Sequence, residues 1–324
     1  MFFYSVFPIM KKVIEMKDLR VVFMGTPDFA VPVLEKLILN TNVCLVVSQP
    51  DKEVGRHKIL MPTPVKKKAL EHNIKVFQPN KIRTDYEAIC DAKPDIIITC
   101  AYGQIIPKVL LDLPRLGCIN VHASLLPYLR GGAPLHHAII DGYDKTGVTI
   151  MYMDEAMDTG DIISSVTYKI KDTDNVGSIH DILMEMGAKL LIETLPSIIN
   201  GTNKRVKQDN LKATYAYNIS RSDEHLDFTK EGITIDRKVR GLNPWPLANT
   251  CFDGEEVKII SGYFVKGKSV PNKINIVTKD NLGIGCSDGI YYVTAIKPSG
   301  KKTMDIKSYL NGVNKDKLLA KKIS

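Results

Sequence analysis

The stretch from Gly117 to Leu135 reads GCINVHASLLPYLRGGAPL, and the prediction of the fold works outward from it. Its first part, Cys118 to Val121, is a short apolar run typical of a strand, along which side chains alternate between two faces. Asn120 and His122 are two residues apart, so both point to the same face. An amide and an imidazole together can bind a carbonyl oxygen and exchange a nearby proton. For this pair alone, an ordinary strand end with a chance histidine is the alternative interpretation, and the motifs that follow favour a reactive centre.

The residues that follow this strand end are typical of a ligand-binding loop. Ser124 to Pro127 reads as a turn, and Arg130 to Gly132 follows it as a glycine-containing loop. Turn residues leave backbone donors available, and glycine allows the backbone to approach a ligand closely.

Upstream of this stretch, apolar runs alternate with helical patterns. One of the helices is expected to begin with Thr63 as N-cap and Pro64 at the first helical position. This alternation predicts a parallel sheet with right-handed crossovers, whose ligands bind beyond the carboxyl ends of the strands. Tyr102 and Gly103 follow such an end. The expected strands are Arg20–Met24, Val43–Ser48, Lys75–Phe77, Asp95–Cys100 and the run that ends at His122.

Downstream, an acidic loop lies between two further strands. A helix is expected over Pro134–Ile140, then strands over Thr146–Met153 and Ile162–Tyr168. The loop between these strands contains Asp158, which could lie against His122 and stabilise its charged form. A solvated hairpin turn is the alternative interpretation of the same acidic residues.

The C-terminal part has a different pattern of elements. A long helix over Gly177–Ile199 is followed by the polar stretch Asn200–Lys212, which we interpret as a linker, and by a short helix over Ile233–Arg240. Short strands at regular spacing then predict a small antiparallel barrel. These strands are Ala248–Phe252, Val257–Tyr263, Lys273–Val277, Leu282–Cys286 and Gly289–Ile296.

Composition narrows the class of protein. The 324 residues suffice for two domains, and the formal net charge of +8 favours an anionic partner. The six cysteines are scattered without a C-x-x-C pair, which fits a reducing cytoplasm and argues against structural zinc.

Gly25-Thr26-Pro27 is not a dinucleotide-binding fingerprint. No stretch is long enough to span a bilayer, and residues 1–15 read as an extension upstream of the functional start near Met16 rather than as a signal peptide.

Six motifs in a fixed order carry a family resemblance. They are VVFMGTPDFAVPVLEKL, SQPDKEVGRHKILMPTPVKKKAL, AYGQIIPKVLL, GCINVHASLLPYLRGGAPL, TGVTIMYMDEAMDTGDI and RGLNPWP. Together they resemble the methionyl-tRNA formyltransferase family, from about Met16 to Asn311. The resemblance implies transfer of the formyl group of 10-formyltetrahydrofolate to the α-amino group of methionine on initiator tRNA.

The resemblance also implies roles for individual residues. The catalytic residues of the family fall on Asn120, His122 and Asp158. Folate contacts fall on Ser124, Leu125, Leu126 and Pro127, to which we add Tyr102 and Gly103 at the neighbouring strand end. The loop Asp51–Pro62, with Arg56 and Lys58, corresponds to the segment that approaches the tRNA acceptor stem.

The resemblance further implies a Rossmann-like α/β catalytic domain over residues 16–199 and an OB-like tRNA-binding domain over residues 213–324, joined by the linker 200–212. We expect a monomer in the cytoplasm, with no metal and no membrane contact. Two alternatives stay open: a formyltransferase acting on a small amine, such as glycinamide ribonucleotide or an amino sugar, and a non-catalytic RNA-binding protein.

Overall fold

The computed structural model describes residues 15–55 and 58–324. The predicted N-terminal extension therefore lies, apart from Glu15, outside the described residues. Contacts divide the chain into two units. One holds the chain up to His122 together with Thr149–Val166 and Met184–Gln208; the other holds Ala123–Val148, Thr167–Leu183 and Asp209–Ser324.

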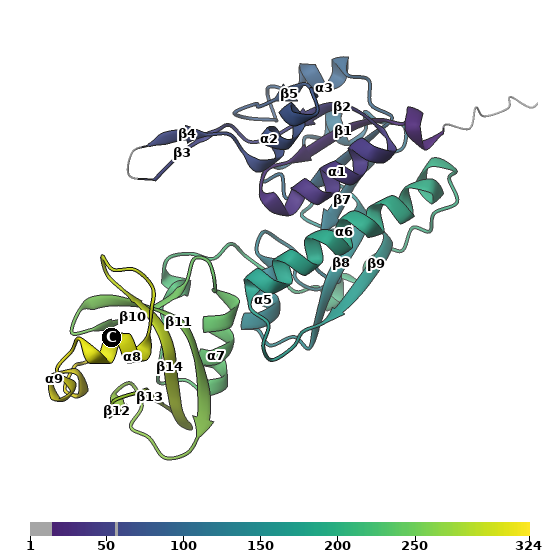
Figure 1. Ribbon diagram of the computed structural model, residues 1–324. Coiled ribbons are helices and arrows are strands. Elements are labelled where there is room, and N and C mark those ends of the chain that lie inside the picture. Colours follow the sequence, from purple (N-terminus) through teal and green to yellow (C-terminus); the bar gives the residue numbers. More distant parts are fainter. Residues whose placement is uncertain (1–14, 56–57) are drawn as a thin grey trace, which may run out of the picture. The chain divides into compact units, whose positions relative to one another are not determined.

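The main sheet has seven strands in the order β5-β2-β1-β6-β7-β8-β9 (Figure 1). Neighbours from β5 to β7 are parallel, which confirms the predicted parallel sheet. Strand β6 is fully buried, as its almost entirely apolar sequence indicates. The strands are β1 (Arg20–Gly25), β2 (Asn42–Val47), β5 (Val76–Phe77), β6 (Ile96–Cys100), β7 (Cys118–His122), β8 (Lys145–Tyr152) and β9 (Ile162–Lys169).

Strand β8 runs antiparallel to β7, so the sheet is mixed. The connecting helix α5 has seven residues and is about 10 Å long. The next strand starts near the end where β7 stops, since His122, the last residue of β7, lies opposite Thr149 of β8. The helices before the C-terminal domain are α1 (Val31–Asn40), α2 (Pro64–Glu71), α3 (Glu87–Asp91), α4 (Lys108–Leu111), α5 (Pro134–Ile140) and α6 (Val176–Ile199), with short 3-10 helices at Met16–Asp18 and Asp28–Ala30.

The strand order reverses its direction of growth between β1 and β6. Gly25, the last residue of β1, is in register with Cys100, the last residue of β6. Just beyond, the Thr26 hydroxyl donates to the main-chain oxygen of Tyr102 at 3.0 Å. Ligands of open α/β sheets bind beyond such a point, so the fold directs attention to the carboxyl ends of β6 and β7.

The segment after β2 forms a hairpin where a loop was expected. Strands β3 (Lys52–Val54) and β4 (Ile59–Met61) pair antiparallel, and Figure 1 shows them standing out from the sheet. The side chains of Ile59, Leu60 and Met61 are 59%, 63% and 49% exposed. The sequence-based prediction missed this hairpin because glycine and charged residues dominate the segment between its strands.

The C-terminal sheet is antiparallel, which confirms the predicted change of architecture. Its edge strands are joined through the end of the chain: Phe252 of β10 forms a bridge with Ile323, and Lys273, just before β12, bridges Lys322. Its elements are β10 (Ala248–Phe252), β11 (Glu255–Lys266), β12 (Ile274–Val277), β13 (Leu282–Cys286), β14 (Gly289–Pro298), β15 (Met304–Asp305), α7 (Gly232–Gly241), α8 (Ile306–Asn311), α9 (Lys315–Leu319) and 3-10 helices at Asn210–Lys212 and Ser222–Glu224.

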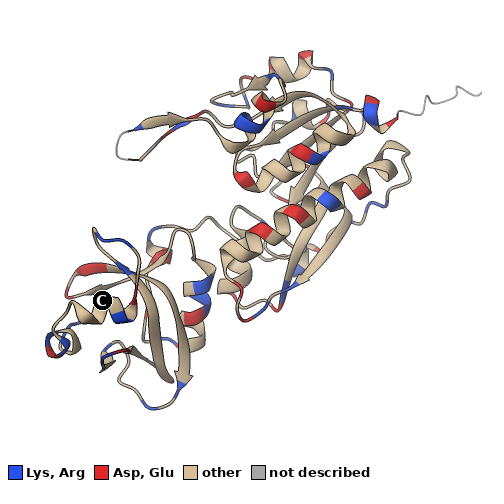
Figure 2. Cartoon of the chain, viewed as in Figure 1, with Lys and Arg blue, Asp and Glu red and all other residues tan. Residues whose placement is uncertain are grey.

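Charge is mixed over this C-terminal part. Figure 2 shows Lys and Arg (blue) on several of its loops and helices, interspersed with Asp and Glu (red). Among the residues that the structure describes, no helix is both long enough and apolar enough to cross a membrane.

Candidate active site

Asn120 and His122 lie in β7, in the interior of the main sheet. His122 is 5% exposed and Asn120 is half-buried. In the register of the sheet, Asn120 lies opposite Thr99 of β6. A buried imidazole and a half-buried amide thus lie two residues apart at the end of a central strand.

Thr99 orients the Asn120 amide. Its hydroxyl donates to Asn120 Oδ1 at 2.8 Å, which occupies the carbonyl end of the amide and leaves Nδ2 as the end that can donate to a ligand. The sequence-based prediction did not identify Thr99. The sequence nevertheless marked Thr99 as unusual, because a hydroxyl in the otherwise apolar strand Ile96–Cys100 requires a hydrogen-bond partner.

The loop between β8 and β9 brings Asp158 to His122. Asp158 Oδ1 lies 3.7 Å from His122 Nδ1, and the two side chains are 17% and 6% exposed. Asp158 has a φ of 55°, in the left-handed region that aspartate tolerates better than most residues. A carboxylate at this distance helps to fix the orientation of the imidazole.

Asp154 and Gly160 shape this loop. Asp154 Oδ1 accepts from the Ala156 N–H at 3.2 Å and from the Thr159 hydroxyl at 2.6 Å. A Cβ on Gly160 would lie 2.0 Å from the main-chain oxygen of Tyr152, so only glycine allows the loop to pack here. The loop conformation that presents Asp158 is thus built from specific local contacts.

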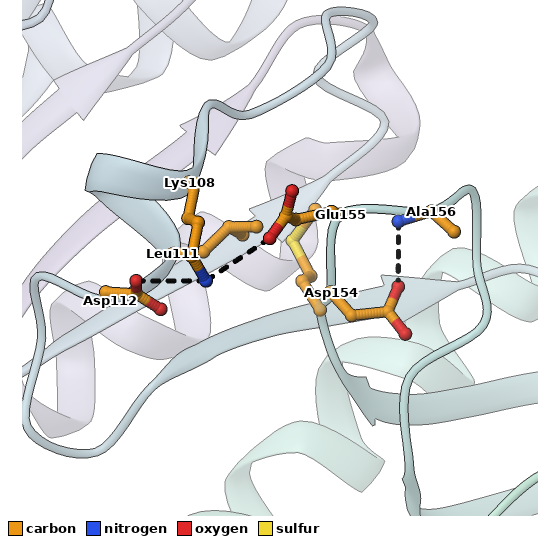
Figure 3. A pocket seen from close by; sticks show the side chains of 7 residues that line it. Lys108, Leu111, Asp112, Asp154, Glu155 and Ala156 are labelled. Carbon is orange, nitrogen blue, oxygen red and sulfur yellow. Dashed lines mark hydrogen bonds and ion pairs between the residues drawn. The ribbon is translucent and has the colours of Figure 1, made fainter.

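A pocket of about 420 Å³ adjoins the loop (Figure 3). The Lys108 ammonium lies 3.2 Å from both the Asp112 and the Glu155 carboxylates, and these hydrogen bonds raise the pKa of Lys108. Met153 connects the pocket to the strand ends, since its sulfur lies 3.2 Å from the Thr99 hydroxyl. The lining residues are Lys108, Leu111, Asp112, Met153, Asp154, Glu155 and Ala156, none of which was predicted.

The turn after β7 lines a second hollow, within the other unit. The Ser124 hydroxyl donates to the main-chain oxygen of Tyr128 at 2.6 Å, which closes the turn, and the Leu126–Pro127 peptide bond is cis. Leu125 and Leu126 contribute to a largely apolar pocket of about 870 Å³. Its other lining residues are Tyr128, Leu129 and residues 141–146.

Tyr102 and Gly103 present main chain rather than side chains. The Tyr102 side chain is buried in the core, and burial raises its pKa to about 12. Its hydroxyl has no hydrogen-bond partner among the described residues. The main-chain oxygen accepts from Gln49 Nε2 at 3.2 Å, and Gly103 has a φ of 88°. A ligand contact from this segment would therefore be made by its backbone.

Of the two predicted tRNA-binding residues, Lys58 lies between strands β3 and β4. Lys58 is exposed, with its ammonium 3.9 Å from Glu53, an ion pair that solvent screens strongly. Arg56 lies outside the described residues.

The described residues near the site favour neither a metal centre nor a cysteine nucleophile. In the described ranges, no three His, Cys, Asp or Glu side chains gather as metal ligands. Cys100 and Cys118 are close to this region in sequence, but burial raises the pKa of each thiol to about 12, which disfavours a thiolate nucleophile.

Comparison with known proteins identifies the family. The model for "Formyl transferase" matches residues 19–195, and that for "Formyl transferase, C-terminal domain" matches residues 218–314. The methionyl-tRNA formyltransferase of Bacillus velezensis is 49% identical over 91% of this chain and 95% of its own length. The chain belongs to the methionyl-tRNA formyltransferase family.

Solved structures agree with this family at the level of the fold. The methionyl-tRNA formyltransferase from Clostridium thermocellum aligns with a TM-score of 0.54 at 17% identity, covering 78% of this chain and 96% of that one. WlaRD, a sugar 3N-formyl transferase, aligns with a TM-score of 0.62 at 19% identity, covering 88% and 99%. The formyltransferase fold is therefore shared by proteins with different acceptors.

Proposed function

We propose that this protein transfers the formyl group of 10-formyltetrahydrofolate to the α-amino group of methionyl-tRNA, which gives formylmethionyl-initiator tRNA. Family membership over 91% of the chain supports the reaction class. One observation carries the assignment of the site: Asp158 Oδ1 lies 3.7 Å from Nδ1 of His122. His122 lies on the same strand as Asn120.

The chemistry of formyl transfer explains these residue types. The amine attacks the formyl carbon, a new C–N bond forms, and the carbonyl oxygen gains negative charge. Asn120 Nδ2 and the charged His122 imidazole are suitable donors to that oxygen. The bond from the formyl carbon to the folate nitrogen then breaks, and a proton passes from the attacking amine to that nitrogen. Asp158 stabilises the imidazolium and assists this proton transfer.

We propose that the donor is bound by the turn Ser124, Leu125, Leu126 and Pro127 and by the backbone at Tyr102 and Gly103. The pocket of about 870 Å³ that Leu125 and Leu126 line supports this role for the turn, because its volume is in the range of small-molecule sites. The proposed reaction uses amide, imidazole and carboxylate groups and needs no metal.

For the acceptor, we propose that Arg56 and Lys58 of the segment Asp51–Pro62 bind the acceptor stem and that the C-terminal domain binds the tRNA body through phosphate contacts. The proposed domains are a catalytic domain over residues 16–199, a linker over 200–212 and a tRNA-binding domain over 213–324, after an extension over 1–15. The family-model matches to residues 19–195 and 218–314 support this division. We further propose a monomer that works in the cytoplasm.

One assay tests the substrate. Purified protein with 10-formyltetrahydrofolate is offered methionyl-tRNA, glycinamide ribonucleotide or a nucleotide-linked amino sugar, and formylated product is measured. We expect transfer to methionyl-tRNA alone. Transfer to a small amine instead would replace the proposed acceptor, and transfer to none of them would indicate an RNA-binding protein without this activity.

The roles of the site residues are tested by substitution. Asn120→Ala and His122→Ala should each lower kcat by a hundredfold or more, because each removes about 3 kcal/mol of transition-state stabilisation. Asp158→Asn should preserve the shape of the loop and still impair turnover. Folate affinity, measured by fluorescence titration, should change little in all three variants. Near-normal kcat in both alanine variants would refute the site.

A further inference from the structure

The segment from Asn203 to Gln208 is packed against the β8–β9 hairpin, although its polar sequence reads as a linker. Val206 exchanges two main-chain hydrogen bonds with Ile162 of β9, at 2.8 and 2.9 Å. Arg205 Nε lies 2.9 Å from Asp161 Oδ2, and its guanidinium lies 4.1 Å from the centre of the Tyr152 ring. The segment is therefore joined to this hairpin by an isolated β-bridge and by side-chain contacts.

Gln208, at the end of the segment, contacts the loop that carries Asp158. Its Nε2 donates to the main-chain oxygen of Asp158 and to that of Gly160, each at 2.8 Å. One amide nitrogen has two hydrogens, so both carbonyl oxygens are satisfied by a single side chain. The two carbonyls lie on either side of Thr159 along the chain, and the shared donor fixes the backbone where it turns.

The backbone at this turn needs such support. Asp158 has a left-handed φ of 55°, and a non-glycine residue in that region is strained and persists only where its surroundings hold it. Gly160, two residues after Asp158, has no side chain that could support the turn. A loop with these features can relax to another backbone conformation, which would carry the Asp158 carboxylate away from its position 3.7 Å from His122.

We propose that Gln208 is a positioning residue for formyl transfer, which holds the Asp158 carboxylate against His122 through the backbone of the β8–β9 loop. This inference rests on the proposed function. The segment between the two family-model matches, which contains Gln208, would then contribute to turnover and would not only connect the two domains. Gln208 touches neither the donor nor the acceptor in this role and acts only through Asp158.

The test compares two substitutions with a matched control. Gln208→Leu keeps the bulk of the side chain and removes both donated hydrogens, and Gln208→Glu keeps the shape while replacing the donor nitrogen with oxygen. Asn275→Leu is the control, because Asn275 Nδ2 also donates to two main-chain oxygens at 2.8 Å, those of Val270 and Lys273, in the C-terminal domain.

With 10-formyltetrahydrofolate and methionyl-tRNA as substrates, Gln208→Leu should lower kcat about tenfold, since an ångström-scale misplacement of a reacting group can cost up to about a hundredfold. Both KM values should stay within about twofold of wild type, and Asn275→Leu should keep wild-type kcat. Equal kcat in Gln208→Leu and Asn275→Leu would overturn the proposal, as would a loss that appears in KM alone.

The pH dependence separates positioning from packing. In Gln208→Glu, the ionised carboxylate would face two carbonyl oxygens and could not donate, whereas the protonated carboxyl group could donate to one of them. The ratio of kcat in Gln208→Glu to kcat in Gln208→Leu should therefore rise as pH falls. A flat ratio would contradict a hydrogen-bonding role.

Hydrogen–deuterium exchange gives a readout independent of activity. Peptides covering residues 153–162 should exchange faster in Gln208→Leu than in wild type or in Asn275→Leu. Unchanged exchange would show that Gln208 does not hold the loop and would overturn the inference. If wild-type protein formylates no methionyl-tRNA, the proposed function fails and the role of Gln208 in turnover falls with it, while the exchange result still decides the structural link.

Discussion

The Asn120 amide illustrates how a functional side chain depends on a neighbour from another strand. Its spacing from His122 is visible in the sequence, but the direction in which its donor points is fixed by Thr99, which is remote in sequence and adjacent in register. An amide presents its donor usefully only when its oxygen is held elsewhere. Thr99 therefore belongs with the predicted site residues as a positioning group.

Thr99→Val is predicted to lower kcat about fivefold to tenfold, because a lost hydrogen bond of about 1 kcal/mol lets the Asn120 amide rotate. Steady-state kinetics with saturating donor checks this. Thr194→Val is the control: its buried hydroxyl also makes hydrogen bonds, to Leu190 and Ser164, but within and beside α6. A control that loses as much kcat as Thr99→Val would point to general destabilisation instead.

Among the elements, the loop of the β8–β9 hairpin is held in place by several specific contacts. Asp154 caps the loop from within, Gly160 allows it to pass close to Tyr152, and Gln208 holds its backbone from outside. The C-terminal sheet uses a comparable device, since the last residues of the chain bridge its two edge strands. Both elements depend on short segments that carry no obvious secondary-structure pattern.

Gly160→Ala tests the loop. The added Cβ would sit 2.0 Å from the Tyr152 oxygen, so the loop must shift. We expect a loss of about 2 kcal/mol in the free energy of unfolding, as for overpacked sites, and a fall in kcat with it. Gly267→Ala is the matched change, because its Cβ meets nothing within 4 Å. Thermal unfolding and kinetics of both variants decide; wild-type behaviour of Gly160→Ala would mean that the loop is not held as described.

Ile323→Ala tests the closure of the C-terminal sheet. Ile323 is 6% exposed and packs in the core of this domain, so truncation should cost about 2 kcal/mol through lost burial and a cavity. Denaturant unfolding provides the measurement, with Lys315→Ala, a change at an exposed position of α9, as the control. Equal midpoints for Ile323→Ala and the control would show that the terminal residues do not secure the sheet.

The net charge is a property of the whole molecule and cannot be assigned to any single element. The formal net charge is +8, while acidic and basic residues are interspersed over the C-terminal part (Figure 2). Binding of tRNA by phosphate contacts releases counterions, and its strength therefore depends on salt. Folate carries far fewer charges and should depend on salt only weakly.

We therefore predict that KM for methionyl-tRNA rises steeply with salt concentration while KM for 10-formyltetrahydrofolate changes little. A plot of log KM against log salt, measured for each substrate with the other at saturation, gives the two slopes. Parallel slopes would reject phosphate contact as the basis of tRNA binding and would direct the search for the acceptor site away from the basic residues.

The sequence by itself predicted the strands of the two main sheets except the short β15, the parallel part of the N-terminal sheet, the Thr63 cap of α2 and the strand that bears Asn120 and His122, but not the β3–β4 hairpin. Such features follow from local periodicity, capping and alternation, which operate over a few residues. Only the tertiary structure decided that Thr99 meets Asn120, that Asp158 lies 3.7 Å from His122, and that the stretch up to Gln208 packs on their loop. Those contacts join residues from 21 to 50 positions apart, and their geometry depends on strand register and loop conformation, which local propensities leave open.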